Sequence, residues 1–375
     1  MMSRNLMKFA RQEWLKSFIR VGKLALATLL LLALASPAQA QTFDQAVAAA
    51  CTASDLASNF VCSGTPGPSS GSTTALSRES SPVEERKVQR LVGSLSLFLS
   101  GEYERFDKNV TKFEPGYKTD TGRATIGADY SFNNDRFVIG GAFKYARDDG
   151  NFKGGGRFDT DSYGPLLYAN FVPAPKFFID AAAGYTRKNY FISRAASVNV
   201  TTGTLAGDTD GNEFKVGMNG GYDFNFQNIT FGPRLGLHYK RTNIDGYRER
   251  GSTGLTGLEL VYDSQSENSL TSVLGFYGSV AISTGFGVLV PQTTVEYVHE
   301  FQDPQRRIRF GLAGDPTVGK FSFQNDPPDR NYFNLGVGIA AVLPHGFSPF
   351  VNYRALVGYK DQSSHAVTAG LRVKF

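Results

Sequence analysis

The residues that could carry out acid–base, nucleophilic or metal chemistry are scattered along this sequence of 375 residues. The four histidines, at positions 238, 299, 345 and 365, lack the close spacing of metal ligands. AISTG (281–285) matches the G-x-S-x-G turn of catalytic serines only loosely and falls on an expected turn. GDTDG (207–211) could bind calcium, but alone in a long loop such a segment is more often a solvated turn. The sequence therefore predicts no enzyme, no cofactor and no catalytic or metal-binding residue, and His238 is expected on a strand.

The first 40 residues have the layout of a secretory signal peptide. Six basic residues precede the apolar run 24–35, and an A-x-A site ends at Ala40. The apolar run is too short for a membrane span, which needs ~20 residues, so cleavage is expected after Ala40. The sequence has 39 Lys and Arg against 34 Asp and Glu; six of the basic residues and one acid, Glu13, lie in this segment. The remainder is therefore neutral, with 33 of each, and its charge predicts no nucleic-acid partner.

Two cysteines, Cys51 and Cys62, follow the signal segment. In an exported protein an even number of cysteines predicts a disulfide, because the compartments outside the cytoplasm are oxidising. The alternative is two free thiols. An alkylation mass shift at both cysteines in outer-membrane material would contradict the disulfide.

From residue 95 onward the sequence is a series of alternating segments, each with an apolar residue at every second position. The opposite face is polar, with charges on strand after strand, as at Asp129, Arg234, Glu296 and Arg372. A polar inner face and an apolar outer face are typical of a transmembrane β-barrel. A soluble β-sandwich explains neither this polarity nor the loop pattern below. The twelve segments are 95–106, 124–132, 137–147, 162–171, 177–190, 213–226, 229–242, 269–282, 288–301, 332–343, 347–358 and 364–375.

Short and long connections alternate between these segments, as in outer-membrane barrels, which have short periplasmic turns and longer extracellular loops. Tyr and Phe gather near the segment ends, where interfacial girdles are expected. The last segment continues its alternation to Phe375, so we expect it to close the barrel by pairing with the first strand. The long connections are expected as loops at 107–123, 148–161, 191–212, 243–268 and 302–331.

The segments 113–143, 158–171, 269–301 and 333–375 closely resemble the autotransporter β-domain, the translocator of type V secretion. The resemblance covers about 94–375. It implies a twelve-stranded antiparallel barrel in the outer membrane of a Gram-negative bacterium, in contact with lipid and assembled by periplasmic chaperones and the barrel-assembly machinery. The fold class is therefore all-β, a transmembrane barrel preceded by a short helical and linker segment, and we expect a monomer. The resemblance also implies a C-terminal signal read by that machinery, formed by Val367, Ala369, Leu371, Val373 and Phe375.

The family's passenger precedes the barrel, but here only residues 41–93 lie between the signal (1–40) and the barrel (94–375). A short helix around 43–60 and a flexible Gly/Ser/Pro linker at 66–82 are expected. The resemblance implies a helix inside the pore at 83–95, with a solvated helix or periplasmic linker as the alternative. Its charged residues are Glu84, Glu85, Arg86, Lys87 and Arg90.

Three functions fit this organisation. The first is a translocator that threads residues 41–82 through its lumen and displays them. The second is a surface-binding protein whose long loops contact a host or neighbouring cell. The third is a passive channel, because twelve strands lie between the filled barrels of about 8 strands and the open pores of about 16.

Overall fold

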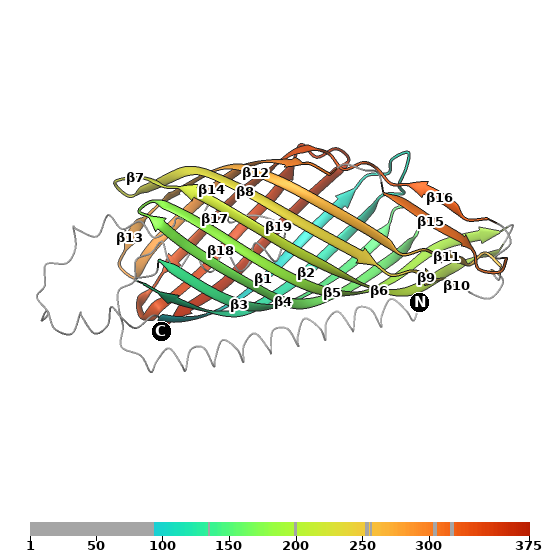
Figure 1. Cartoon of the computed structure of the whole chain (residues 1–375), viewed down its shortest axis with the longest axis horizontal. Helices are drawn as coiled ribbons and strands as arrows, with labels where there is room; N and C mark the ends of the chain where they lie inside the picture. Colours follow the sequence, from blue (N-terminus) through green and yellow to red (C-terminus); the bar gives the residue numbers. More distant parts are fainter. Residues whose placement is uncertain are drawn as a thin grey trace, which may run out of the picture.

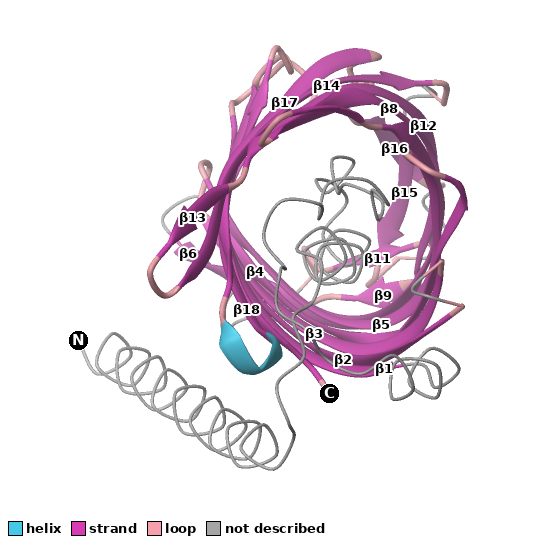
Figure 2. Cartoon of the chain, turned by 90° about the vertical axis from the view of Figure 1, so that its left-hand side faces the viewer, coloured by secondary structure: helices cyan, strands magenta, loops and turns pink. Residues whose placement is uncertain are grey.

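The computed structural model describes residues 94–133, 136–198, 201–251, 255, 257–302, 306–315 and 319–375. Twelve antiparallel strands form one barrel (Figures 1 and 2). Among the described residues no helix is long and apolar enough to cross a membrane. The barrel strands are β1 (Ser94–Lys108), β2 (Tyr117–Phe132), β3 (Phe137–Phe152), β4 (Gly156–Ala174), β5 (Phe177–Val198), β6 (Thr201–Tyr222), β8 (Ile229–Ile244), β12 (Gln265–Val280), β14 (Gly287–Glu300), β17 (Asn331–Val342), β18 (Phe347–Val357) and β19 (Gln362–Lys374).

The barrel closes between its first and last strands, as the sequence predicts. β1 pairs with β19 from Ser96 opposite Lys374 to Lys108 opposite Gln362. The amide of Phe375 continues this ladder by donating to the carbonyl of Leu95 at 2.8 Å. Figure 2 shows the resulting ring of strands. Closure leaves no unpaired barrel edge, which is the condition for a sheet to cross a lipid bilayer.

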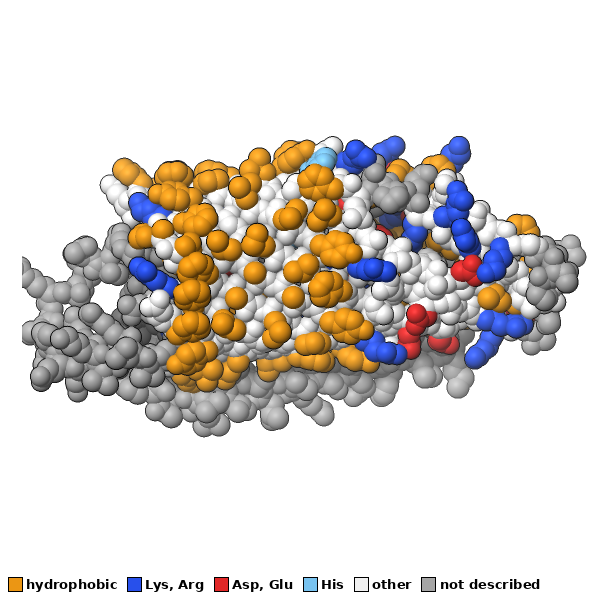
Figure 3. Space-filling view, in the orientation of Figure 1, with side chains coloured by type: hydrophobic (Ala, Val, Ile, Leu, Met, Phe, Trp, Pro, Cys, Tyr) orange, Lys and Arg blue, Asp and Glu red, His pale blue; other side chains and the backbone are white. Residues whose placement is uncertain are grey.

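The exterior carries an apolar band, visible as the orange belt in Figure 3. At the end with short turns, the band is bordered by phenylalanines. The ring of Phe137 stacks on that of Phe132 with 5.4 Å between centroids and on that of Phe171 with 4.3 Å. At the other border, tyrosine hydroxyls donate to polar side chains, as Tyr145 does to Asp161 at 2.6 Å. These borders confirm the predicted girdles, because interfacial aromatic residues place an apolar ring beside lipid and a polar edge beside water. Exposed members of the band include Ile126, Leu167, Leu235, Leu274 and Val337.

Two of the predicted long loops are wrong, because the strands continue through them. We call the end of the barrel opposite the C-terminus its upper end. The segment 148–161 is the upper part of β3 and β4, which turn at residues 153–155. The segment 191–212 is the upper part of β5 and β6, which stay paired up to Val198 opposite Thr201. GDTDG is therefore strand and not a turn, and AISTG contains the short strand β13 (Ile282–Thr284). Beyond the apolar band both strand faces meet polar surroundings, so the alternation that marks a strand in sequence disappears although backbone pairing continues.

Within the predicted loop 107–123, only residues 109–116 lie between β1 and β2. The connections 243–268 and 302–331 build a small sheet at the end opposite the C-terminus (Figure 1). β15 (Arg307–Leu312) pairs with β16 (Phe321–Gln324) and β11 (Leu260–Tyr262), and β11 pairs with β9 (Tyr247–Arg248). Tyr262 stacks on Tyr247 at 4.7 Å, and its burial raises its pKa to about 12, so its hydroxyl stays protonated at neutral pH. We call this sheet the crown. The other short elements are β7 (Phe224–Phe226), β10 (Arg250–Gly251) and the 3-10 turn η1 (Pro344–Gly346).

Candidate functional site in the barrel lumen

The inner face of the barrel is lined by polar and charged side chains, several of which pair with one another across strands. Strand alternation places them there, because side chains two residues apart point to the same face. The buried members include the four inward residues named from the sequence, Asp129, Arg234, Glu296 and Arg372, together with Thr125, Asp180, Asp223, Thr294 and Asn334. The predicted inside-out polarity is thus confirmed, and the lumen is the first candidate for the functional site.

A bidentate ion pair spans the seam where the barrel closes. Two guanidinium nitrogens of Arg372 on β19 contact the two carboxylate oxygens of Asp129 on β2, with Nη1 2.7 Å from Oδ2. Tyr168 on β4 donates its hydroxyl to the same carboxylate at 2.9 Å. All three side chains are buried, and β1 lies between β19 and β2. The seam is therefore held by side chains as well as by the β1–β19 backbone ladder.

A second buried pair lies near the short-turn end of the lumen. The guanidinium of Arg234 on β8 pairs with Asp223, and neither side chain is exposed. Its carbon lies 4.7 Å from the ring centroid of Phe178 and 5.2 Å from that of Tyr277. A guanidinium between two aromatic faces gains cation–π attraction while its charge is balanced by the carboxylate. This cluster fixes β6, β8, β5 and β12 to one another across the lumen wall.

The upper lumen is divided into an acidic sector and a basic sector. In the acidic sector, Glu102 and Glu104 on β1 share Arg123, whose Nη1 is 2.6 Å from Glu104 Oε2. In the basic sector, Lys188 and Lys215 contact the carboxylate of Glu213 at 2.7 and 2.8 Å.

The basic sector extends over further strands. Lys144 on β3 and Lys240 on β8 interact electrostatically with Glu213 as well. Four lysines thus surround one carboxylate, so this side of the lumen carries an excess of positive charge. On β1, two carboxylates contact the guanidinium of Arg123, and Arg354 also interacts electrostatically with Glu104.

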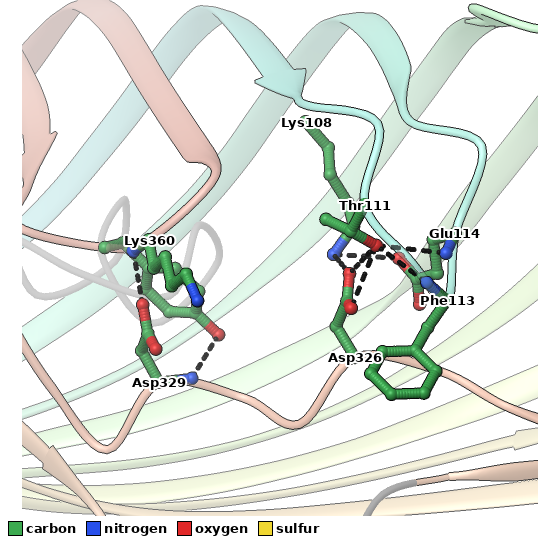
Figure 4. Close-up of polar contacts among 8 residues, drawn as sticks. Lys108, Thr111, Phe113, Glu114, Asp326, Asp329 and Lys360 are labelled. Carbon is green, nitrogen blue, oxygen red and sulfur yellow. Dashed lines mark hydrogen bonds and ion pairs between the residues drawn. The ribbon is translucent and has the colours of Figure 1, made fainter.

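A different set of contacts fastens the loops at the upper rim (Figure 4). The chain between β16 and β17 reaches past β18 and β19 to β1, where Asp326 lies 2.9 Å from Lys108 Nζ and accepts from Thr111 Oγ1 at 2.8 Å. Farther along, the carboxylate of Asp329 accepts from the amide of Lys360. Lys108 is buried, so this pairing also satisfies a charge that is shielded from solvent. The rim of the lumen is consequently braced by the longest connection.

Comparison with known proteins now identifies this architecture. A family model described as autotransporter beta-domain matches residues 97–354. The chain belongs to the autotransporter β-domain family. The translocator domain of the autotransporter NalP from Neisseria meningitidis is similar in structure, with a TM-score of 0.59 and 16% identity over 77% of this chain and 92% of that one. The β-domain of the Bordetella autotransporter BrkA gives 0.55 and 18%, over 74% and 98%.

Curated relatives agree with this assignment. Outer membrane protein B of Rickettsia rickettsii is 25% identical over 275 residues, which cover 69% of this chain and 16% of that protein. Lipase 1 of Photorhabdus luminescens is 23% identical over 255 residues, which cover 67% of this chain and 38% of that protein. The chain thus spans well under half the length of these relatives. The autotransporter barrel is an outer-membrane translocator domain of a Gram-negative bacterium, and by the usual arrangement its short turns face the periplasm and its crown faces outward.

The residues predicted to form special sites fall into two groups. Cys51, Cys62, Glu84, Glu85, Arg86, Lys87 and Arg90 lie outside the described residues, so the disulfide and the pore helix stay predictions, as do the boundaries 1–40 and 41–93. Val367, Ala369, Leu371 and Val373 lie on β19 as expected, and Val373 is fully buried against Leu97, Phe347, Leu371 and Phe375. The recognition of this strand by the assembly machinery stays a prediction.

His238 lies on lumen strand β8, as expected. Its Nε2 is 2.7 Å from the amide oxygen of Asn219 on the neighbouring strand β6. Among the described residues no cluster of His, Cys, Asp and Glu could hold a metal ion. The absence of enzymatic activity stays a prediction.

Sequence reasoning missed the aromatic residues that point into the autotransporter lumen. Phe98 and Tyr168 are buried there and meet edge to face, with 6.1 Å between ring centroids. Tyr168 covers Gly140, where an added Cβ would lie 2.2 Å from the ring. A signal was available in the glycine-rich inner face, because a glycine on one strand leaves room for a ring from the next strand.

Proposed function

We propose that this autotransporter barrel passes residues 41–82 through its lumen and displays them at the cell surface. The observation that carries the proposal is the closed barrel, whose inner wall offers paired charges and hydrogen-bonding groups to a polar chain. Residues 66–82 are rich in Gly, Ser and Pro and have the composition of a flexible linker. A flexible segment of this kind can be threaded without unfolding a stable domain. Membership of the translocator family supports the same function.

An epitope inserted after Ser72 tests this proposal. On intact cells we expect it to bind antibody and to be removed by protease. The same epitope after Gly257, in the connection that leads into crown strand β11, is the positive control, because an added side chain there meets nothing within 4 Å. An epitope after Asn228, in a short periplasmic turn, is the negative control. Display is excluded if the Ser72 epitope reacts only after permeabilisation while the Gly257 epitope reacts on intact cells.

We also propose that residues 83–93 form a helix that fills the lumen. The two charge sectors of the upper lumen support this, because they complement a segment with charges of both signs. The basic sector offers lysines to Glu84 and Glu85, and the acidic sector offers carboxylates to Arg86, Lys87 and Arg90. Opposite charges in such a shielded position attract more strongly than they would in water.

Single-channel conductance in planar bilayers tests whether residues 83–93 fill the lumen. Deleting residues 41–93 is expected to raise single-channel conductance several-fold, since the lumen loses its occupant. Reversing Glu84 and Glu85 to lysine should produce part of that rise, because lysines would then face the basic sector. The control is Glu79→Lys, which makes one such charge reversal in the linker. An unchanged low conductance after the deletion would disprove the plug.

A further inference from the structure

A polar cavity of about 590 Å³ lies at the foot of the crown, outside the lumen sites described above. Its wall is formed by the chain that leads from β11 into β12 and by the beginning of β15. Arg306, Arg307 and Arg309 all line it, together with side chains that carry hydroxyl or amide groups, such as Ser264 and Gln265. Cavities of about 300–1,000 Å³ are the usual size of small-ligand sites.

The charges in this wall do not balance. The carboxylate of Asp263 is occupied by Lys320, whose Nζ lies 2.7 and 2.9 Å from its two oxygens. The carboxylate of Glu267 faces Arg306 at 3.5 Å. Within the described part of the chain, Arg307 and Arg309 have no carboxylate partner. The cavity therefore presents two guanidinium groups whose charge is not neutralised by any carboxylate of the described residues.

The backbone places these two arginines on one side of β15, two positions apart. Arg307 and Arg309 are exposed and occupy alternate positions of β15, so they point to one side, while Ile308 between them is buried on the other. β15 is paired on both edges, with β16 and with β11, and the carbonyl of Arg309 accepts from the amide of Asp263 at 3.0 Å. Two residues of a strand span about 7 Å. The two side chains thus leave β15 close enough together for both guanidinium groups to reach one phosphate group.

A contact with Tyr239 gives the position of the cavity along the barrel axis. Asn268, which lines it, accepts a hydrogen bond at 3.1 Å from Tyr239, a member of the outer tyrosine girdle. The cavity therefore begins where the apolar band ends, at the level of lipid headgroups and within reach of the external medium. Figure 3 shows Lys and Arg side chains gathered on this side of the apolar belt.

We propose that this cavity binds a phosphorylated sugar. Arg307 and Arg309 contact the phosphate, because planar guanidinium groups donate two parallel hydrogen bonds to its oxygens. Ser264, Gln265 and the other hydroxyl and amide groups of the wall bind the sugar hydroxyls. Such a ligand is carried by headgroups of the outer leaflet or occurs free in the medium. This activity goes beyond translocation and uses none of the lumen residues described above.

The test uses the full barrel in neutral detergent and glucosamine 1-phosphate as the probe, with binding followed by calorimetry. The double variant Arg307→Gln, Arg309→Gln is expected to weaken binding at least tenfold, since hydrogen bonds to charged groups each contribute substantially. Arg250→Gln is the control, because it removes one positive charge from another exposed arginine of the outward end, away from the cavity. Unphosphorylated glucosamine should bind far more weakly than the phosphorylated probe.

A second arm distinguishes the two sources of the ligand. The barrel is placed in vesicles that contain lipid A or in vesicles of phosphatidylcholine, and its crown is exposed to limited proteolysis. The readout is the fraction of barrel whose crown stays uncut. Protection by lipid A that is lost in the double variant assigns the site to a headgroup. Binding of glucosamine 1-phosphate without such protection assigns it to a free saccharide. Equal affinity of the wild type and the double variant for glucosamine 1-phosphate, or equal loss in Arg250→Gln, overturns the proposal.

Discussion

Replacing Asp129 by alanine is expected to lower the free energy of unfolding of the barrel by about 3–5 kcal/mol, the usual cost of breaking a buried ion pair from one side. The change leaves the guanidinium of Arg372 buried at the closing seam, where its side chain is 2% exposed. It also removes the acceptor of the Tyr168 hydroxyl. The loss of unfolding free energy should therefore exceed the contribution of the ion pair or of the tyrosine hydrogen bond taken alone.

Urea unfolding in detergent, followed by far-UV circular dichroism, measures this change. Asp210→Ala is the matched control, because Asp210 pairs with Arg187 at 2.8 Å but both side chains are about half exposed; there we expect less than about 1 kcal/mol. The double variant Asp129→Leu, Arg372→Met removes both charges and should recover most of the stability, since an apolar replacement of a buried pair is often neutral. A double variant as unstable as Asp129→Ala would show that the unpaired charge is not the cause.

Replacing Gly232 by alanine is expected to reduce barrel assembly severely, at a cost of about 3 kcal/mol or more, because added atoms in a packed wall force the backbone to move. The new Cβ would lie 1.8 Å from the carbonyl oxygen of Tyr222, far inside contact distance. That carbonyl also accepts from Arg234 Nη1 at 3.0 Å. Separating the two strands here would thus disturb the buried Arg234–Asp223 pair as well.

The measurement is the fraction of barrel in the outer membrane that keeps its folded mobility on unheated gels. Gly278→Ala serves as the control, because its Cβ would meet only Thr293 Cγ2 at 3.7 Å, an ordinary contact. Both variants make the same chemical change on a barrel strand. If Gly232→Ala assembles as well as Gly278→Ala, the close approach of Tyr222 does not limit assembly.

Several features of the barrel were accessible from the sequence because lipid imposes a strict period of two. Within the apolar band each outward residue must be apolar, so the positions of twelve strands, the polar inner face and the pairing of the last strand with the first could be predicted. The same rule failed above the band. At 148–161 and 191–212 water surrounds the strands, no face must be apolar, and the sequence of a paired strand looks like that of a loop.

Which residues face lipid and which face the lumen follows from the sequence, because that choice depends only on the parity of a position within its strand. Which lumen residues contact one another depends on the fold. Asp129 and Arg372 are separated by 243 positions and become partners when the ring closes. Arg307 and Arg309 face the segment after β11 only because β15 pairs with β11, although the two strands belong to different connections of the chain. Such contacts follow from strand register and barrel closure, which no local pattern of residue types encodes.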